Sequence, residues 1–228
     1  MACVERGRGP YWENRMSADG ESVENQGFVW DSREPDAAAL REAMGMFPTG
    51  VTVLTSGHGE NTEGMTANAV ISVSLDPVLF LVSVHRETRI NPRIKECGYY
   101  AASLLAANQE GLSRLFASPE RSSGLSAVKS LGGGYGETGA PLAAGALAAI
   151  ECELESVYPG GDHELFLGRV VAVHLGDTRR GPLVFHEGGY PFLSRGDSPE
   201  GSNAFVDSVR GFDARLSGRA GRAGRRRK

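Results

Sequence analysis

The sequence predicts a mainly β protein, an antiparallel barrel with a few peripheral helices. Several short segments rich in β-branched residues follow one another, with Gly- or Pro-containing turns between them. One long segment, residues 147–158, alternates apolar and acidic side chains, as expected of a strand with one buried face. A doubly wound sheet would need a helix after nearly every strand, whereas helical periodicity here is confined to a few stretches.

The patterned block spans residues 36–195, which is long enough for one sizeable domain. It opens with a helix that Asp36 caps and that ends before Pro48. Four apolar residues share one face of this helix: Leu40, Ala43, Met44 and Phe47. The next predicted elements are strands over 50–56, 65–75 and 78–84, a helix over 88–97, a strand over 99–105 and a helix over 107–117. The strand over 78–84 is apolar on both faces, which predicts a central position.

The second half of the block reads as a hairpin followed by short strands. In residues 147–158 one face carries Ile150, Cys152 and Leu154, and the other carries Glu151, Glu153 and Glu155. We therefore expect the glutamates to face solvent. A turn over 159–162 leads into a strand over 163–175, and segments 182–185 and 188–193 complete the sheet.

The two ends of the chain differ from this block. Residues 1–35 are polar and Gly-rich without periodicity, and residues 196–228 are basic, so both are predicted to be disordered tails. From Arg210 onward the charge is +7, and because the whole chain carries −4, the remainder carries −11. Such an acidic body makes nucleic acid an unlikely partner, except weakly through the basic tail. No apolar run suits a membrane span or a signal core, so the expected location is the cytoplasm.

The usual catalytic motifs are missing. Residues Gly134–Gly139 formally match the dinucleotide fingerprint G-x-G-x-x-G, but Pro141 follows and no helix begins there, so the segment is interpreted as a flexible loop. No phosphate-binding loop or nucleophile elbow occurs, and neither the histidines nor the three cysteines show the spacing of a metal site. A bound cofactor could instead carry the chemistry, and Thr66–Ala69 offer small side chains against which a flavin ring could lie.

Four motifs in order closely resemble the flavin reductase-like domain of two-component flavin monooxygenases. They are FPTGVTVLTS, GMTANAVISVSLDPVLFLVSV, GDHELFLGRVVAV and PLVFHEGGY. The resemblance implies a Greek-key split β-barrel and a homodimer with flavin near the subunit interface. It implies hydride transfer from NADH or NADPH to FMN or FAD, with the reduced flavin handed to a separate oxygenase.

The resemblance also implies particular site residues. In relatives of this kind the matching His163 lies near the nicotinamide, which makes it the candidate catalytic residue, and Tyr190 closes over the pocket. The implied flavin contacts are Thr66, Ala67, Asn68, Ala69, Val70, Ser72, Val73, Ser83, Thr88, Arg89, Arg93 and Phe116. Arg89 and Arg93 are expected at the phosphate, because a guanidinium is a forked donor.

Other functions fit the same residues. One is a reductase of this fold with bound flavin and another acceptor, such as a corrinoid or ferric complex. A second is a flavin-binding module without turnover. A third is a nucleic-acid-associated protein that uses the basic tail, which deletion of residues 210–228 would separate from flavin reduction. The choice between FMN and FAD, and between NADH and NADPH, stays open.

Overall fold

The structure is a computed structural model, and it describes residues 33–177 and 179–193. The chain divides into two compact units, residues 1–44 and 45–228. The predicted tails lie outside the described residues, apart from 33–35. No helix in the described part of the chain is long and apolar enough to cross a membrane.

Helix α1 (Ala37–Gly45) belongs mostly to the first unit. Its predicted cap is confirmed, because the Asp36 carboxylate accepts a 2.7 Å hydrogen bond from the Ala39 N–H. None of the helix residues is buried, and Leu40 and Met44 on the predicted apolar face are 64% and 54% exposed.

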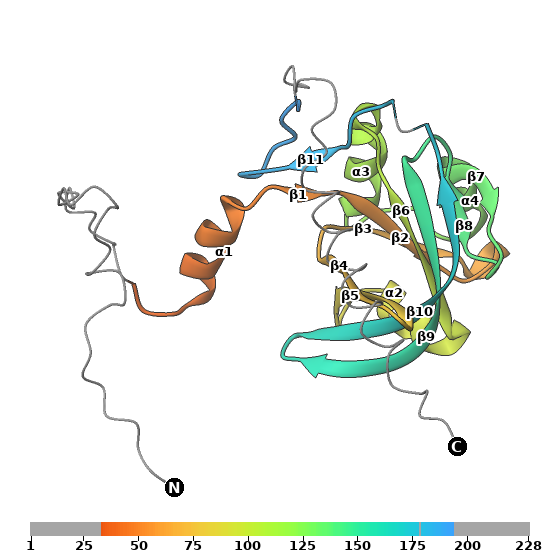
Figure 1. The fold of residues 1–228 in the computed structure, drawn as a ribbon, viewed down its shortest axis with the longest axis horizontal. Coiled ribbons are helices and arrows are strands. Elements are labelled where there is room, and N and C mark those ends of the chain that lie inside the picture. The colour runs from red at the N-terminus through yellow and green to blue at the C-terminus, as the bar shows by residue number, and fades with distance from the viewer. Residues whose placement is uncertain (1–32, 178, 194–228) are drawn as a thin grey trace, which may run out of the picture. The chain divides into compact units, whose positions relative to one another are not determined.

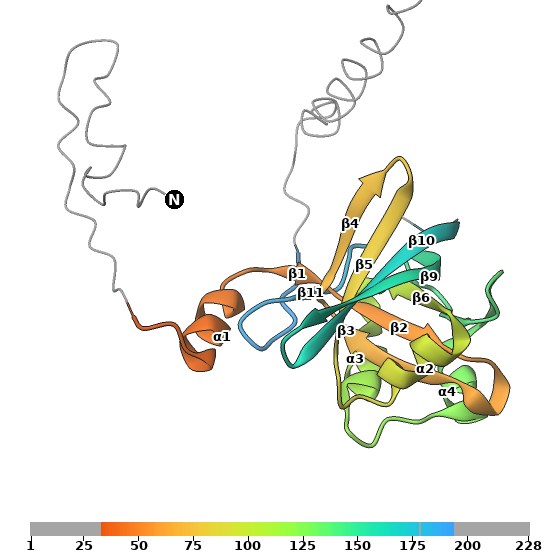
Figure 2. The same cartoon turned by 90° about the horizontal axis from the view of Figure 1, so that it is seen from below.

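The second unit is built on one antiparallel sheet of seven strands in the order β3-β2-β6-β9-β10-β5-β4 (Figures 1 and 2). The mainly β, antiparallel class is therefore confirmed. In sheet order the strands are Glu63–Ala67, Thr52–Ser56, Tyr99–Leu104, Ala148–Gly160, His163–Leu175, Val78–His85 and Val70–Leu75. The predicted hairpin over 147–175 is confirmed as the long pair β9 and β10, whose register shifts at two places, between Leu167 and Gly168 and between Val170 and Ala172.

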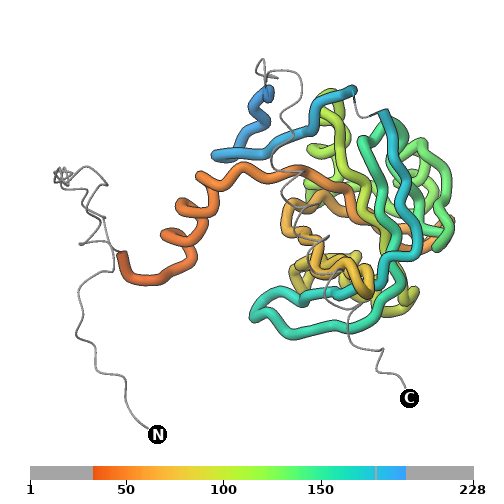
Figure 3. The backbone as a smooth tube through the Cα atoms, viewed as in Figure 1, coloured from red at the N-terminus to blue at the C-terminus, as the bar shows by residue number. Residues whose placement is uncertain are grey.

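The sheet is open between its two edge strands, and these edges are neighbours in sequence. The predicted single strand over 65–75 is wrong: it divides into β3 and β4, separated only by Asn68 and Ala69. Figure 3 shows the course of the backbone through the second unit. The Ala67 carbonyl accepts a 2.7 Å hydrogen bond from Thr52 Oγ1, whereas the Ala69 carbonyl accepts one of 2.9 Å from the Ser83 N–H. The chain thus passes from one edge of the open sheet to the other within two residues.

The core lies in two clusters on the sheet. One lies beneath α2 (Ile90–Cys97) and includes Phe80, Tyr100 and Phe166, and the Tyr100 hydroxyl donates a 2.8 Å hydrogen bond to the Phe80 carbonyl. The other includes Phe116 and Leu131 and packs α3 (Glu110–Ala117) and α4 (Gly124–Leu131). Helix α4 was not predicted, although its buried residues Gly124, Ala127 and Leu131 follow helical spacing.

The small elements depart further from prediction. Strand β1 (Thr49–Gly50) pairs with β11 (Val184–Phe185), and β7 (Gly132–Tyr135) pairs with β8 (Pro141–Ala143). Two 3₁₀ turns cover Gly59–Asn61 and Ala107–Gln109. The predicted strand over 188–193 is wrong, since these residues form no strand beyond the isolated bridge between His186 and Gly189.

Strand β5 is covered on one face only, so its predicted burial on both faces is wrong. Phe80, Val82 and Val84 are buried in the core, while the alternating residues Leu79 and Leu81 are half-buried on the other face. Strand β5 is also next to the edge strand β4 rather than central. This leaves an apolar sheet face without a covering layer among the described residues.

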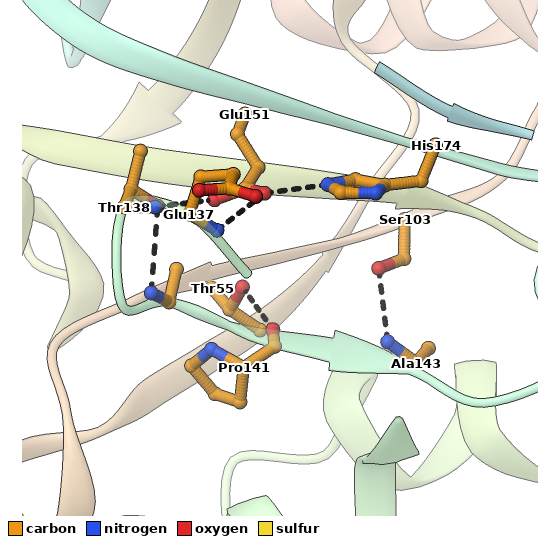
Figure 4. Close-up of polar contacts among 9 residues, drawn as sticks. Thr55, Ser103, Glu137, Thr138, Pro141, Ala143, Glu151 and His174 are labelled. Carbon is orange, nitrogen blue, oxygen red and sulfur yellow. Dashed lines mark hydrogen bonds and ion pairs between the residues drawn. The ribbon is translucent and has the colours of Figure 1, made fainter. Parts of the chain in front are cut away.

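The predicted exposure of Glu151 is also wrong, because its side chain is fully buried (Figure 4). The carboxylate accepts hydrogen bonds from the Glu137 N–H (2.9 Å), the Thr138 N–H (2.7 Å) and Thr138 Oγ1 (2.6 Å), and pairs with His174 Nε2 at 2.6 Å. Burial alone would raise the pKa of Glu151, but the hydrogen bonds outweigh burial and hold the pKa below its usual range.

The formal fingerprint loop is therefore anchored around a carboxylate of its own chain rather than free. A β-carbon on Gly136 would lie 2.2 Å from Glu151 Oε1, so the close approach requires glycine at that position. The backbone N–H groups that such loops often offer to a phosphate are occupied here by Glu151.

Candidate functional site

The segment Thr66–Ala69 lies where the sheet is open, with a hollow on each side. We call the first the His163 hollow; its lining is Met65, Thr66, Ala67, Asn68, Ala69, Ser83, His85 and His163. We call the second the Tyr190 hollow; its lining is Val51, Thr66, Ala67, Asn68, Ala117, Phe185 and Tyr190. Thr66, Ala67 and Asn68 form the wall that both hollows share. Asn68 and Val70 also line a third, larger hollow beside Pro182.

Two side-chain hydrogen bonds and the packing of Phe116 hold the wall in place. Thr66 Oγ1 donates a 2.7 Å hydrogen bond to the Ser113 carbonyl on α3, and Asn68 Nδ2 donates one of 3.1 Å to Thr49 Oγ1. Phe116 packs so closely behind β3 that a β-carbon on Gly64 would lie 2.6 Å from its ring. Phe116 is fully buried and supports the wall from behind, so its direct contact with flavin stays a prediction.

His163 is the first residue of strand β10 and lies on one side of the wall. Its Cα pairs in register with that of His85 on β5, and the two rings meet edge to face with centres 5.1 Å apart. Asp162, in the preceding turn, has its Oδ1 2.7 Å from His163 Nδ1. The hydrogen bond from His163 lowers the pKa of Asp162. The sequence analysis did not include Asp162 among the site residues.

Tyr190 stands on the other side of the wall in a fixed position. Its hydroxyl is 2.8 Å from Ser113 Oγ, and its ring meets Phe185 edge to face at 5.5 Å. The guanidinium of Arg114 lies over the same ring at 5.1 Å. These contacts hold the ring at the lining of the Tyr190 hollow, and its role at the nicotinamide stays a prediction.

Two arginines lie at the far end of β3. Arg89 Nε is 3.1 Å from the Glu63 carboxylate, and its Nη2 donates a 2.7 Å hydrogen bond to the Arg121 carbonyl. Arg121 Nε donates to the Gly64 carbonyl at 2.9 Å. Burial and the neighbouring charge of Arg89 lower the pKa of Arg121. Since β3 rises about 3.4 Å per residue, these cations stand roughly 10 Å from Ala67 along the strand.

Arg121 is a candidate that sequence reasoning missed. It lies in an irregular segment between α3 and α4, and its position beside β3 depends on a contact across 57 residues of sequence. A basic residue in a Ser-rich loop after a helix was the only local signal.

The remaining predicted residues lie elsewhere. Ser72 and Val73 are exposed on edge strand β4, and neither lines one of the three hollows described above. Thr88 Oγ1 donates to the His85 carbonyl at 2.7 Å and so stabilises the turn after β5. Arg93 on α2 pairs with Glu96 at 2.8 Å. Direct flavin contacts by these four residues stay predictions.

The residues around the wall are suited to an organic cofactor. Ala67 and Ala69 let a planar ring approach the backbone, and β3 as an edge strand presents peptide groups away from β2. Arg89 and Arg121, at the other end of β3 from Ala67, could bind a phosphate. Among the described residues, no group of three or more His, Cys, Asp or Glu side chains could hold a metal ion.

An open antiparallel sheet with a bare wall at its split defines a cofactor-binding split barrel. A family model described as "Flavin reductase like domain" matches residues 44–194, and the chain belongs to this family. The resemblance inferred from the four motifs is confirmed.

Characterised relatives and solved structures agree with this assignment. The chain is 46% identical over 160 residues to the NADH-dependent FMN reductase AsuE2 of Streptomyces nodosus subsp. asukaensis, covering 70% of this chain and 86% of the relative. It is similar to BorF, the flavin reductase component of a bacterial two-component tryptophan halogenase, with 42% identity and a TM-score of 0.65 over 69% of this chain and 98% of BorF. It is also similar to the NADH:FAD oxidoreductase SgcE6 of Streptomyces globisporus, solved with NAD and FAD fragments; identity is 37% and the TM-score 0.66, over 72% and 96% of the two chains.

Proposed function

We propose that the protein is an NADH-dependent flavin reductase that transfers a hydride to FMN or FAD and supplies reduced flavin to a partner oxygenase. The observation that carries this function is the bare wall Thr66–Asn68 between the His163 hollow and the Tyr190 hollow. The NADH-dependent relatives support the hydride donor, and the halogenase component supports the oxygenase partner. Since NADH is the donor, we place the reaction in the cytoplasm.

The residues of this chain would bind the flavin and orient it. Ala67 and Ala69 permit close approach to the backbone, and Asn68 sits at the junction of the hollows. Arg89 and Arg121 provide cationic donors for a phosphate. Flavin, when bound, supplies the two-electron acceptor. Tyr190 restricts water from one side of the wall, and His163 offers a ring nitrogen for hydrogen bonding on the other side.

Steady-state NADH oxidation with and without added FMN or FAD tests this function. We expect turnover that depends on added flavin. Negligible NADH oxidation in the presence of both flavins, by protein that binds flavin, would contradict it.

Replacing His163 with alanine should slow flavin reduction by a factor of 10 to 100, roughly the value of one charge-assisted hydrogen bond. Stopped-flow measurement at saturating NADH checks this rate. His58→Ala, an exposed histidine that packs on Tyr135 outside the hollows, serves as the matched control and should reduce flavin at the wild-type rate. A wild-type rate in His163→Ala would remove His163 from the reaction.

We also propose that the protein is a homodimer whose second copy covers the outer face of β4, β5 and β10. The register pairs Ile71 with Leu81 and Leu81 with Leu167, so these side chains share one face. Ile71 on the edge strand β4 is 58% exposed. An apolar sheet face of this kind normally packs against another layer. Ser83 and His85 lie on the same face, so a second copy there would border the His163 hollow.

Ile71→Arg should therefore dissociate the dimer, because each subunit would bury a charge against an apolar face. We expect the dimer dissociation constant to rise at least roughly 100-fold, measured by sedimentation velocity over a concentration series. Leu125→Arg, at a 53% exposed position on α4, is the control and should leave the dimer intact. Wild-type protein that stays monomeric at high concentration would contradict the proposal.

A further inference from the structure

The turn between β9 and β10 places one carboxylate beside two imidazoles. Asp162 Oδ1 lies 2.7 Å from His163 Nδ1, and its Oδ2 lies 3.9 Å from His85 Nε2. The two rings stand nearly perpendicular, at 84°. Both histidines line the His163 hollow, so the orientation of each ring bears on the site.

The hydrogen bond to Asp162 determines which nitrogen of His163 carries the proton. The pKa of Asp162 is held below its usual range, chiefly by the hydrogen bond from His163, so the carboxylate is ionised and can only accept. Nδ1 of His163 must therefore carry the hydrogen. Its Nε2 is left to meet a ligand.

His85 is held in the opposite tautomer. The backbone N–H of Glu87 donates a 3.2 Å hydrogen bond to His85 Nδ1, so that nitrogen presents its lone pair and Nε2 carries the hydrogen. The turn that supplies this donor is itself fixed, because Thr88 donates through both its N–H and its hydroxyl to the His85 carbonyl. A second proton on His85 would break the bond from Glu87.

The other charged groups nearby are engaged elsewhere. Arg86 Nε donates to the His163 carbonyl at 3.3 Å, and its N–H donates to the Asp162 carbonyl. Glu164, the next residue on β10, pairs with Lys95 of α2. In the described part of the chain, the imidazole nitrogens are thus set by Asp162 and by the Glu87 N–H.

We propose that Asp162 is a positioning residue that fixes His163 in the Nδ1–H tautomer, so that Nε2, which carries no proton in the neutral ring, is the nitrogen available to the cofactors. Asp162 acts through His163 and needs no contact with the cofactors itself. The role in catalysis rests on the proposed flavin reduction, whereas the tautomer assignment concerns the protein alone.

Long-range ¹H–¹⁵N NMR of the histidine rings in the full, flavin-free chain tests the assignment near neutral pH. We expect an Nδ1–H pattern for His163 and an Nε2–H pattern for His85. In Asp162→Ala, His163 should lose its Nδ1–H pattern, while His85 keeps its own. An Nε2–H pattern for His163 in the wild type, or an unchanged pattern in Asp162→Ala, would overturn the proposal.

A double-mutant comparison tests the functional consequence. Asp162→Ala should slow flavin reduction about tenfold in the wild type and cause no further loss in His163→Ala. Asp162→Asn, whose amide oxygen can still accept from Nδ1, should recover part of the rate. Asp177→Ala, at the other end of β10, is the control for a lost turn carboxylate and should leave the rate unchanged.

A failure of the positioning role and a failure of the proposed function would give different results. Equal losses from Asp162→Ala in the presence and absence of His163 would overturn the positioning role while flavin reduction stands. The expected tautomers in a protein that oxidises no NADH would instead overturn the proposed function and leave the assignment of the histidines in place.

Discussion

Ala69→Trp is expected to lower the affinity for FMN and FAD roughly 100-fold while the fold stays intact. Ala69 is exposed and lines the His163 hollow, so an indole there would occupy the space against which a flavin ring would lie. The backbone of Ala69 keeps its role, since the bond from Ser83 N–H to its carbonyl does not involve the side chain. Fluorescence quenching of free flavin by the protein measures the affinity, and circular dichroism checks the fold.

Ala144→Trp is the matched control. Ala144 is also exposed but lies after β8, outside the three hollows described, so this variant should bind flavin like the wild type. Equal affinity in Ala69→Trp and Ala144→Trp would remove Thr66–Ala69 from the flavin site.

Glu151→Ala is expected to lower the free energy of unfolding by about 3 kcal/mol. The substitution leaves the N–H groups of Glu137 and Thr138, the Thr138 hydroxyl and His174 Nε2 without their shared acceptor. Urea denaturation measures the loss. Glu153→Ala, an exposed glutamate two residues along the same strand, should cost less than about 0.5 kcal/mol. Equal effects of the two substitutions would contradict the structural role of Glu151.

The same carboxylate predicts a pH dependence of stability. Its pKa in the folded state is lowered relative to the ordinary value of 4.5. A lowered pKa means that the contribution of Glu151 is complete above about pH 4.5 and is lost as the pH falls toward the folded-state pKa. The wild type should therefore lose more stability below pH 4.5 than Glu151→Gln does, as measured by urea denaturation over a pH series.

Local periodicity predicted much of the fold. The helix after Asp36, the helix that became α3 and the long hairpin of β9 and β10 appear where the apolar spacing indicated. These elements depend on near neighbours in sequence, and the pattern of side chains alone expresses their burial.

The errors came from contacts between distant segments. The alternation of side chains continues across Asn68 and Ala69, so only the pairing of β3 with β2 and of β4 with β5 shows that the strand divides there. Glu151 seemed to belong to a solvent face, but residues 136–139 fold over that face and supply its donors. Asp162 and Arg121 likewise gain their roles from partners that the local sequence does not identify.

The sequence predicted where the candidate site lies, but it did not predict the contacts that each residue makes there. The small residues of Thr66–Ala69 and the family motifs indicated the wall, His163 and Tyr190, all of which line the two hollows. The full burial of Phe116 was not predictable, because an aromatic residue at the end of a helix looks the same in sequence whether it faces a ligand or the core.

A crystal structure of the protein with FMN bound tests the central claim most directly. The account predicts the flavin ring against Thr66–Ala69, between His163 and Tyr190, with the phosphate near Arg89 and Arg121. A ring bound away from this wall, for example in the hollow beside Pro182 alone, would contradict it.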